Sequence, residues 1–123
     1  MTDTAITGTC HCGAVRITVD EAPEQVTSCN CSICRRTGGL WAYYSPRVVR
    51  FSPAKPPTDI YRWGDEDLDL HRCKTCGCVT HWSPVDQASD RMGVNMRMAD
   101  PAVLAKARVR RFDGADTWKF LDD

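Results

Sequence analysis

The sequence predicts a single, mainly β domain spanning residues 1–123, in which zinc bound by cysteines holds distant strands together. Three observations lead to this prediction. Apolar residues recur with the two-residue period of strands, turn-forming residues interrupt the chain at short intervals, and all eight cysteines fall into three clusters. A chain of 123 residues is long enough for one hydrophobic core and short for two domains.

The clearest predicted strand covers residues 15–20, where Val15, Ile17 and Val19 alternate with polar neighbours. This alternation places one face in the core and the other in water. The same period, bounded by proline, glycine and aspartate turns, predicts later strands at 41–45, 47–51, 59–63, 67–71, 78–82, 92–96 and 108–113.

Two short helical segments complete the predicted fold. Residues 32–37 are expected to form one turn that ends at Gly38 and Gly39. Residues 102–107 are expected to form the second, because Asp100 is a good N-cap and Pro101 suits the first helical position.

The charge balance and the lack of long apolar runs exclude several classes of protein. Lys and Arg total 16, as do Asp and Glu, which argues against a basic nucleic-acid-binding protein. No run approaches the roughly 20 apolar residues of a transmembrane helix, and residues 1–4 do not resemble a secretory signal. We therefore expect a cytoplasmic protein that binds neither nucleic acid nor membranes.

The clustering of the cysteines favours metal binding over disulfides. The cytoplasm keeps thiols reduced, although in an oxidising compartment eight cysteines could form four disulfides. Cysteines at C-x-C spacing, such as Cys10 and Cys12, are poorly placed to bond each other but can converge on one ion.

The first predicted metal site is structural. Cys73, Cys76 and the following Gly77 have the spacing of a zinc knuckle, which supplies two of the four thiolates of a closed tetrahedral site. Cys10 and Cys12 form a second pair. The simplest partition therefore joins these four cysteines around one structural zinc.

The second predicted site uses Cys29, Cys31 and Cys34, which leave the fourth position of a tetrahedral ion open. Two alternatives remain: closure by Cys78, His11, His71 or His81, or no stable second metal. Three thiolates on a divalent ion carry a net charge of −1, so an open site is a weak Lewis acid suited to binding an incoming thiol.

The residues around the second cluster admit two interpretations each. Arg35 and Arg36 either offset the thiolate charge and hold a carboxylate, or form a solvated face. Trp41, with Tyr43 and Tyr44, either lines a substrate cleft or belongs to the core. His81 is either a surface histidine or a base in a pocket.

Three ordered motifs resemble the glutathione-dependent formaldehyde-activating enzyme family, also called the centromere protein V family. They lie at residues 8–15 (GTCHCGAV), 29–36 (CNCSICRR) and 72–77 (RCKTCG), and residues 95–97 and 112–114, with Trp118, resemble the family's C-terminal half. The resemblance implies a zinc-stapled antiparallel beta-tent fold. It also implies a structural zinc on Cys10, Cys12, Cys73 and Cys76 and a catalytic set of Cys29, Cys31 and Cys34.

The family resemblance further implies a reaction and a partner. The reaction is the reversible addition of glutathione to formaldehyde, which gives S-hydroxymethylglutathione and is classed in reverse as a carbon–sulfur lyase. Charge and proximity to the motifs predict substrate contacts at Arg35, Arg36 and Arg97, with Trp41 beside them. The alternative is a non-catalytic, zinc-stabilised module that binds a thiol metabolite or a protein, and the sequence leaves the oligomeric state open.

Overall fold

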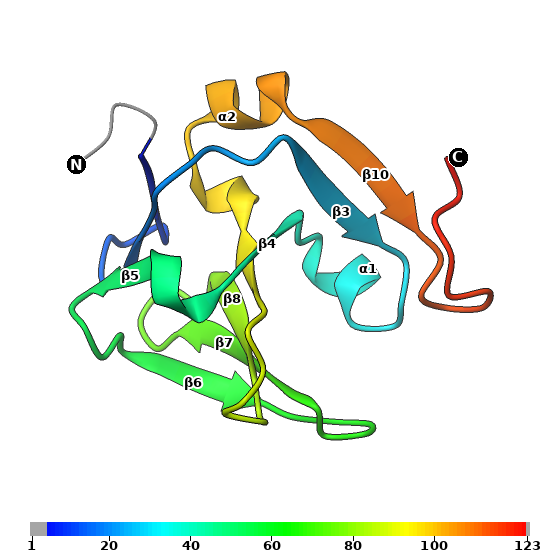
Figure 1. Cartoon of the computed structure of the whole chain (residues 1–123). Helices are drawn as coiled ribbons and strands as arrows, with labels where there is room; N and C mark the ends of the chain where they lie inside the picture. The colour runs from blue at the N-terminus through cyan, green and yellow to red at the C-terminus, as the bar shows by residue number, and fades with distance from the viewer. Residues whose placement is uncertain (1–4, 123) are drawn as a thin grey trace.

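The computed structural model describes residues 5–122 and confirms the mainly β fold class (Figure 1). Its ten strands are β1 Ile6–Thr9, β2 Arg16–Val19, β3 Gln25–Cys29, β4 Trp41–Tyr44, β5 Val49–Ser52, β6 Thr58–Tyr61, β7 Leu68–Cys73, β8 Val79–Pro84, β9 Met92–Asn95 and β10 Arg108–Phe112. Its helices are α1 Cys34–Thr37 and α2 Pro101–Lys106, with 3₁₀ turns at Pro46–Val48 and Met96–Met98. The longer α-helix has six residues, and no helix among residues 5–122 is long and apolar enough to span a bilayer.

Seven strands form the larger sheet, in the order β10-β3-β4-β9-β8-β7-β6. All neighbours in this sheet are antiparallel except β10 and β3, which run parallel. The parallel pair departs from the predicted antiparallel pattern, and α2 explains it. This helix returns the chain to the start of β3, where the Arg108 N–H donates to the Glu24 carbonyl over 2.9 Å, so β10 leaves in the direction of β3.

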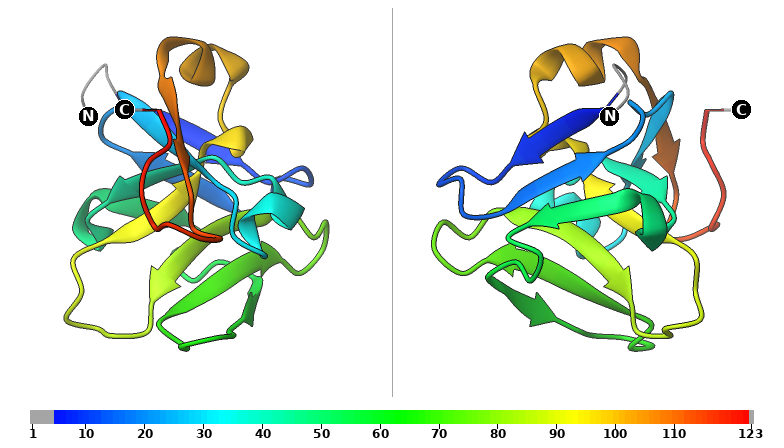
Figure 2. Two further views of the ribbon diagram at one scale, coloured as in Figure 1. Left: turned by 90° about the vertical axis from the view of Figure 1, so that its right-hand side faces the viewer. Right: turned by 60° about the vertical axis from the view of Figure 1, so that its left-hand side comes forward.

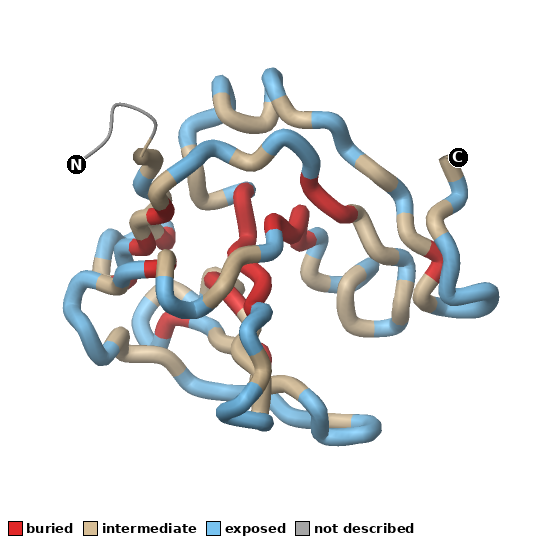
Figure 3. Tube along the Cα trace, viewed as in Figure 1, coloured by how far each residue is buried: buried red, intermediate tan, exposed pale blue. Residues whose placement is uncertain are grey.

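The smaller sheet has the order β1-β2-β5 and covers the hydrophobic core from one side. In β2 the predicted alternation is present, since Ile17 and Val19 are buried while Arg16 is exposed. These side chains join one buried cluster with Ala42 of β4 and Val94 of β9. Figure 3 shows buried segments gathered near the centre of the molecule, and the buried cluster also includes Cys10 and Cys73.

Both predicted helices are present with small shifts. The first begins at Cys34 rather than at residue 32 and ends at Gly38, which has a left-handed φ of 70° and donates to the Cys34 carbonyl. The second has Asp100 as its N-cap, with the Asp100 side chain accepting from the Ala102 N–H. The predicted strand at 47–51 instead opens with a 3₁₀ turn and pairs only from Val49 onward.

Two strands, β1 and β3, were not predicted. Neither has an alternating run of apolar residues, because β1 contains Gly8 and β3 has the sequence QVTSC. In β1, a side chain at Gly8 would meet the Met98 backbone at 3.1 Å, so the glycine permits close packing. In β3, tertiary burial of Val26 and Thr27 outweighs the polar local sequence.

Candidate metal centres

The first cluster consists of four thiols from two distant turns. Cys10 and Cys12 follow β1, while Cys73 and Cys76 come from the end of β7 and the turn after it, and their sulfurs lie within 4.8 Å of one another. The Cys12 sulfur is 3.7 Å from that of Cys10 and 3.6 Å from that of Cys73. Tetrahedral zinc with Zn–S bonds of about 2.3 Å needs sulfurs about 3.8 Å apart, so this donor set fits zinc.

Backbone N–H groups orient the sulfurs of this cluster. The Val15 N–H points at the Cys10 sulfur over 3.3 Å, and the Thr75 N–H points at the Cys73 sulfur over 3.4 Å. The second turn closes where Gly77, with a left-handed φ of 77°, donates to the Cys73 carbonyl over 3.0 Å. Such donors favour the thiolate form that a metal requires.

The thiols of this cluster ionise unequally. The N–H groups of Cys12 and Cys78 lower the pKa of Cys76 to about 5. The N–H of Ala14 favours the Cys12 thiolate as well, but desolvation and the neighbouring thiols, Cys73 first, raise the pKa of Cys12 to about 11. A divalent cation would offset the repulsion between sulfurs and let all four ionise.

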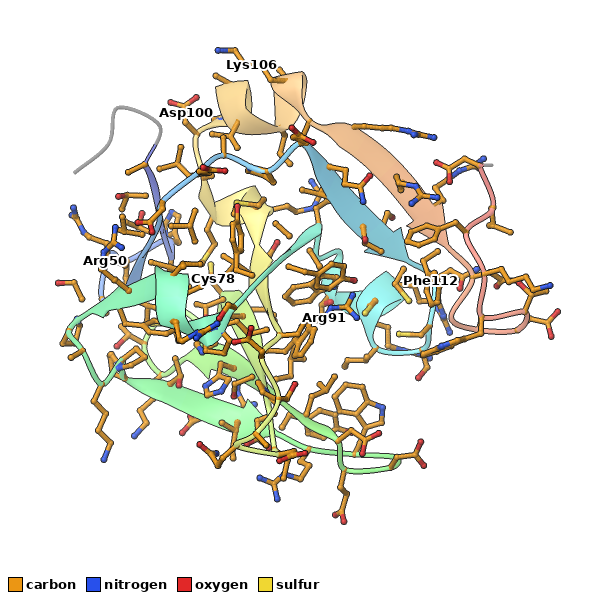
Figure 4. All side chains as sticks on the ribbon, viewed as in Figure 1. Arg50, Cys78, Arg91, Asp100, Lys106 and Phe112 are labelled. Atoms are coloured by element: carbon orange, nitrogen blue, oxygen red, sulfur yellow. The ribbon has the colours of Figure 1, made fainter. Side chains whose placement is uncertain are left out.

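Cys78, the one cysteine outside the two predicted ligand sets, lies beside the four-thiol cluster. Its carbonyl accepts from the Cys73 N–H over 2.9 Å, and its thiol lies near the His11 N–H and the thiols of Cys76 and Cys10. In Figure 4, Cys78 lies on the β5 side of the view, away from α1. Closure of the second site by Cys78 or His11 is therefore wrong.

The other two histidines belong to a different part of the fold. The two ring nitrogens of His71 lie 2.8 Å from the hydroxyls of Thr58 and Ser83. His81 is 2% exposed, which excludes the surface alternative, and it stacks on His71 with ring centroids 4.0 Å apart. Both rings line a groove of about 790 Å³ that none of the cysteines lines, so neither histidine completes the second site.

The second cluster is formed by Cys29 at the end of β3, Cys31 in the following turn and Cys34 at the start of α1. Their sulfurs lie within 4.8 Å of one another, and all three residues are partly buried. Within residues 5–122, no fourth cysteine, histidine or carboxylate joins this group. The arrangement suits an ion with an open coordination position.

The electrostatics of the second cluster favour one thiolate. Burial opposes ionisation of Cys31, but the Cys34 N–H and the thiols of Cys34 and Cys29 outweigh it and lower the Cys31 pKa. Burial raises the pKa of Cys29 and of Cys34, and the neighbouring Cys31 adds to both. Because two of the three thiols resist ionisation, a cation bound at this cluster would favour the thiolate form of all three.

Trp41 supports this cluster from the core. It is 2% exposed, which does not fit the predicted substrate contact and identifies the ring as a core residue. A side chain at Gly39 would meet the indole at 2.6 Å, so this glycine lets the ring pack closely. The buried indole N–H lowers the pKa of Cys34, although burial and the other thiols raise it overall, and it has no hydrogen-bond partner among the described residues. A buried donor facing a sulfur fits a metal-bound thiolate better than a neutral thiol.

The loop after β10 encloses the cluster, a feature that the sequence interpretation did not anticipate. The Asn30 side chain donates to the Asp113 carboxylate and accepts from the Ala115 N–H, both over 2.9 Å. The other carboxylate oxygen of Asp113 accepts from the Thr117 N–H and hydroxyl. Figure 2 shows the C-terminal segment, in red, passing close to the loop before α1. The sequence offered one indication of this contact, because Asn30 stands between the predicted ligands Cys29 and Cys31.

Gly114 is a residue of this loop that lies close to the cysteines, so we expect its substitution to disturb the cluster. A side chain there would lie 2.6 Å from the Cys29 sulfur and 3.2 Å from the Cys31 Cβ. Gly114→Ala is expected to lower zinc affinity of the second cluster by about 10- to 100-fold, the usual cost of disturbing a ligand's immediate surroundings. Competition with a chromophoric chelator measures this affinity.

The matched control for Gly114→Ala is Ala115→Ser, which adds one atom to the exposed neighbouring residue. It is expected to keep the wild-type affinity. A Gly114→Ala variant with unchanged affinity would show that the cluster does not need this close approach.

The predicted arginines lie around α1, and two of them donate to backbone carbonyls just before and just after the helix. Arg36 donates to the Ser32 carbonyl over 2.6 Å, and Arg97 donates to the Gly38 carbonyl at the helix end. Arg35, Arg36 and Arg97 are all exposed. Their predicted contact with substrate carboxylates stays a prediction.

Comparisons with known proteins give relatives of this chain in both structure and sequence. A crystal structure of a Rhodobacter sphaeroides protein matches with a TM-score of 0.69 and 29% identity, over 85% of this chain and 99% of that one. A Halomonas elongata protein, provisionally named a glutathione-dependent formaldehyde-activating enzyme, is 51% identical over 37 residues. This match covers 29% of the chain and about a quarter (24%) of that relative. The family model for the glutathione-dependent formaldehyde-activating enzyme matches residues 5–113. The chain, with its two cysteine clusters on a mainly β fold, therefore belongs to this family.

Proposed function

We propose that this protein catalyses the reversible addition of glutathione to formaldehyde, with S-hydroxymethylglutathione as the product and carbon–sulfur lyase activity in reverse. Membership of the family supports glutathione and formaldehyde as substrates. The observation that carries the proposal is the second cluster, where three thiols converge without a fourth protein donor among residues 5–122. An open position is what distinguishes a catalytic zinc site from a closed structural one.

In this proposal the two clusters have different tasks. Cys10, Cys12, Cys73 and Cys76 hold a structural zinc, and Cys29, Cys31 and Cys34 hold a second zinc that is more easily lost. When bound there, zinc keeps the sulfur of an incoming thiol in its thiolate form at neutral pH. Asn30 and Gly114 fix the loop around the three ligands, and Trp41 directs its N–H at Cys34 from the core.

The chemistry itself is a simple addition. The glutathione sulfur forms a bond to the formaldehyde carbon, the carbonyl π bond breaks, and its electron pair passes to oxygen. The proton lost by the thiol ends on that oxygen, so no oxidant or further reactant is needed. In the reverse direction the carbon–sulfur bond breaks and formaldehyde is released.

The test is Cys31→Ser, because Cys31 ionises most readily of the three thiols and is not fully buried. We expect the variant to fold normally, to contain one zinc ion fewer, and to lose turnover by at least about 100-fold, since losing a ligand costs at least as much as disturbing its surroundings. Turnover must be measured above the enzyme-free rate, because thiols add to formaldehyde unaided.

Cys78→Ser is the matched control, since it makes the same substitution beside the other cluster. It should keep the wild-type metal content and rate. Unchanged turnover in Cys31→Ser would contradict the proposed function. Glutathione binding without any turnover in the wild type would instead support the non-catalytic module.

A further inference from the structure

An arginine that was not among the predicted contacts lies over an aromatic ring of β4, the strand that also carries Trp41. Arg91 immediately precedes β9, and its guanidinium carbon lies 4.0 Å from the centroid of the Tyr43 ring on β4. The ion pairs found within residues 5–122 do not include Arg91. Its acidic neighbour, Asp90, is engaged by Ser45 and Arg47. The side chain is therefore an exposed cation stacked on an aromatic ring.

Tyr43 connects this cation to the cysteines. Trp41 and Tyr43 project from the same face of β4, because side chains alternate along a strand, and the Trp41 indole N–H lowers the pKa of Cys34. Burial raises the pKa of Tyr43, while Arg91 lowers it and the thiols of Cys29 and Cys34 raise it further. The Tyr43 hydroxyl is thus within electrostatic reach of both the guanidinium and the cluster.

A cation at this position would offset the negative charge of the three-thiol cluster. Three thiolates around a divalent ion leave a net negative charge, which repels any substrate that carries carboxylates. A guanidinium stacked on an aromatic ring keeps its edge N–H groups free, and these match the two oxygens of a carboxylate. Of the other arginines near α1, Arg36 and Arg97 already donate to the backbone carbonyls of Ser32 and Gly38, which flank the helix.

We propose that Arg91, held over the Tyr43 ring, binds a carboxylate of the thiol substrate and gives the three-thiol site its preference for acidic thiols. This inference rests on the proposed function and identifies the residue that recognises its substrate class. Tyr43 is a positioning residue in this arrangement, since its ring fixes the orientation of the guanidinium.

The experiment compares glutathione with its diethyl ester, which keeps the thiol but lacks both carboxylates. Turnover and equilibrium binding by calorimetry are measured with the zinc-loaded protein. Arg91→Gln is expected to raise KM and Kd for glutathione by about tenfold, as for the loss of one charge-assisted hydrogen-bonded contact. Values for the ester, and kcat for both thiols, should stay within about twofold of the wild type.

Two further sets of variants separate recognition from general effects of charge. Arg50→Gln removes one cation from β5 in the other sheet, where Arg50 pairs with Asp20 over 2.6 Å (Figure 4). This variant should leave KM and Kd unchanged for both glutathione and its ester. Tyr43→Phe keeps the ring and should retain the preference for glutathione. Tyr43→Leu removes the ring, and this variant should lose part of the preference for glutathione.

The outcomes distinguish this inference from the proposed function. If the wild type does not prefer glutathione to the ester, or if Arg91→Gln leaves the preference unchanged, the inference is overturned even when turnover is normal. If the preference depends on Arg91 but the wild type has no turnover, the inference stands and the proposed function fails.

Discussion

Cys73→Ser is expected to unfold the protein, and prolonged treatment with a strong zinc chelator is expected to do the same. Cys73 is 1% exposed, and its sulfur lies 3.6 Å from that of Cys12, across about sixty residues of sequence. Structural zinc sites of this type contribute about 10–16 kcal/mol in apparent binding free energy. The whole unfolding free energy of a domain is about 5–15 kcal/mol, so the fold should not survive the loss of this ion.

Circular dichroism, with released zinc followed by a colorimetric chelator, measures this effect. The expected result is loss of the cooperative thermal transition together with release of the tightly held ion. Cys12→His is the matched control, because it keeps a zinc donor at an exposed position of the same cluster. A chelated protein that still unfolds cooperatively at the wild-type temperature would contradict the structural role of this cluster.

Acid is expected to destabilise the protein through His81. Burial, with a smaller effect of the adjacent His71, lowers the pKa of His81 to about 3. An unfolded histidine has a pKa of about 6.5. Because the pKa of His81 is lower in the folded state, its neutral form contributes fully to the free energy of unfolding above about pH 6.5. This contribution is lost as the pH falls toward 3, by about 1.4 kcal/mol per pH unit. Two pH units below 6.5 give a loss of about 2.7 kcal/mol at pH 4.5.

The measurement is urea unfolding of the wild type and of His81→Phe between pH 7.5 and 4.5. Phenylalanine keeps an aromatic ring against Phe51, whose centroid lies 4.7 Å from that of His81, but it does not titrate. Acid also protonates thiolates, and this contribution is common to both proteins. The variant should therefore lose stability less steeply, and equal slopes in the two proteins would contradict the prediction.

Much of the fold could be predicted because its pattern is local. The alternation around Ile17 identified β2, and Asp100 followed by Pro101 identified α2. The strand β3 could not be predicted, since Val26 is its one aliphatic residue and its burial depends on contacts with β4 and β10. The parallel pairing of β10 depends in the same way on where α2 returns the chain.

In the candidate site, too, local patterns could be predicted and long-range contacts could not. Cysteine spacing alone predicts that Cys10 and Cys12 join the Cys73 knuckle, because the four-ligand limit of zinc leaves few possible partitions. The surroundings of the second cluster could not be predicted this way. Gly114 and Arg91 lie about 60 to 85 residues along the chain from these cysteines, and nothing in their local sequence indicates where they fold.

The contact between Gly114 and Cys29 also sets an order of events during translation. The four-thiol cluster can close as soon as residue 76 has left the ribosome, before the last 47 of the 123 residues have emerged. The pocket around Cys29 stays open until the strand and loop ending at Gly114 have emerged. A nascent chain would thus complete the four-thiol cluster first and the surroundings of the three-thiol cluster last.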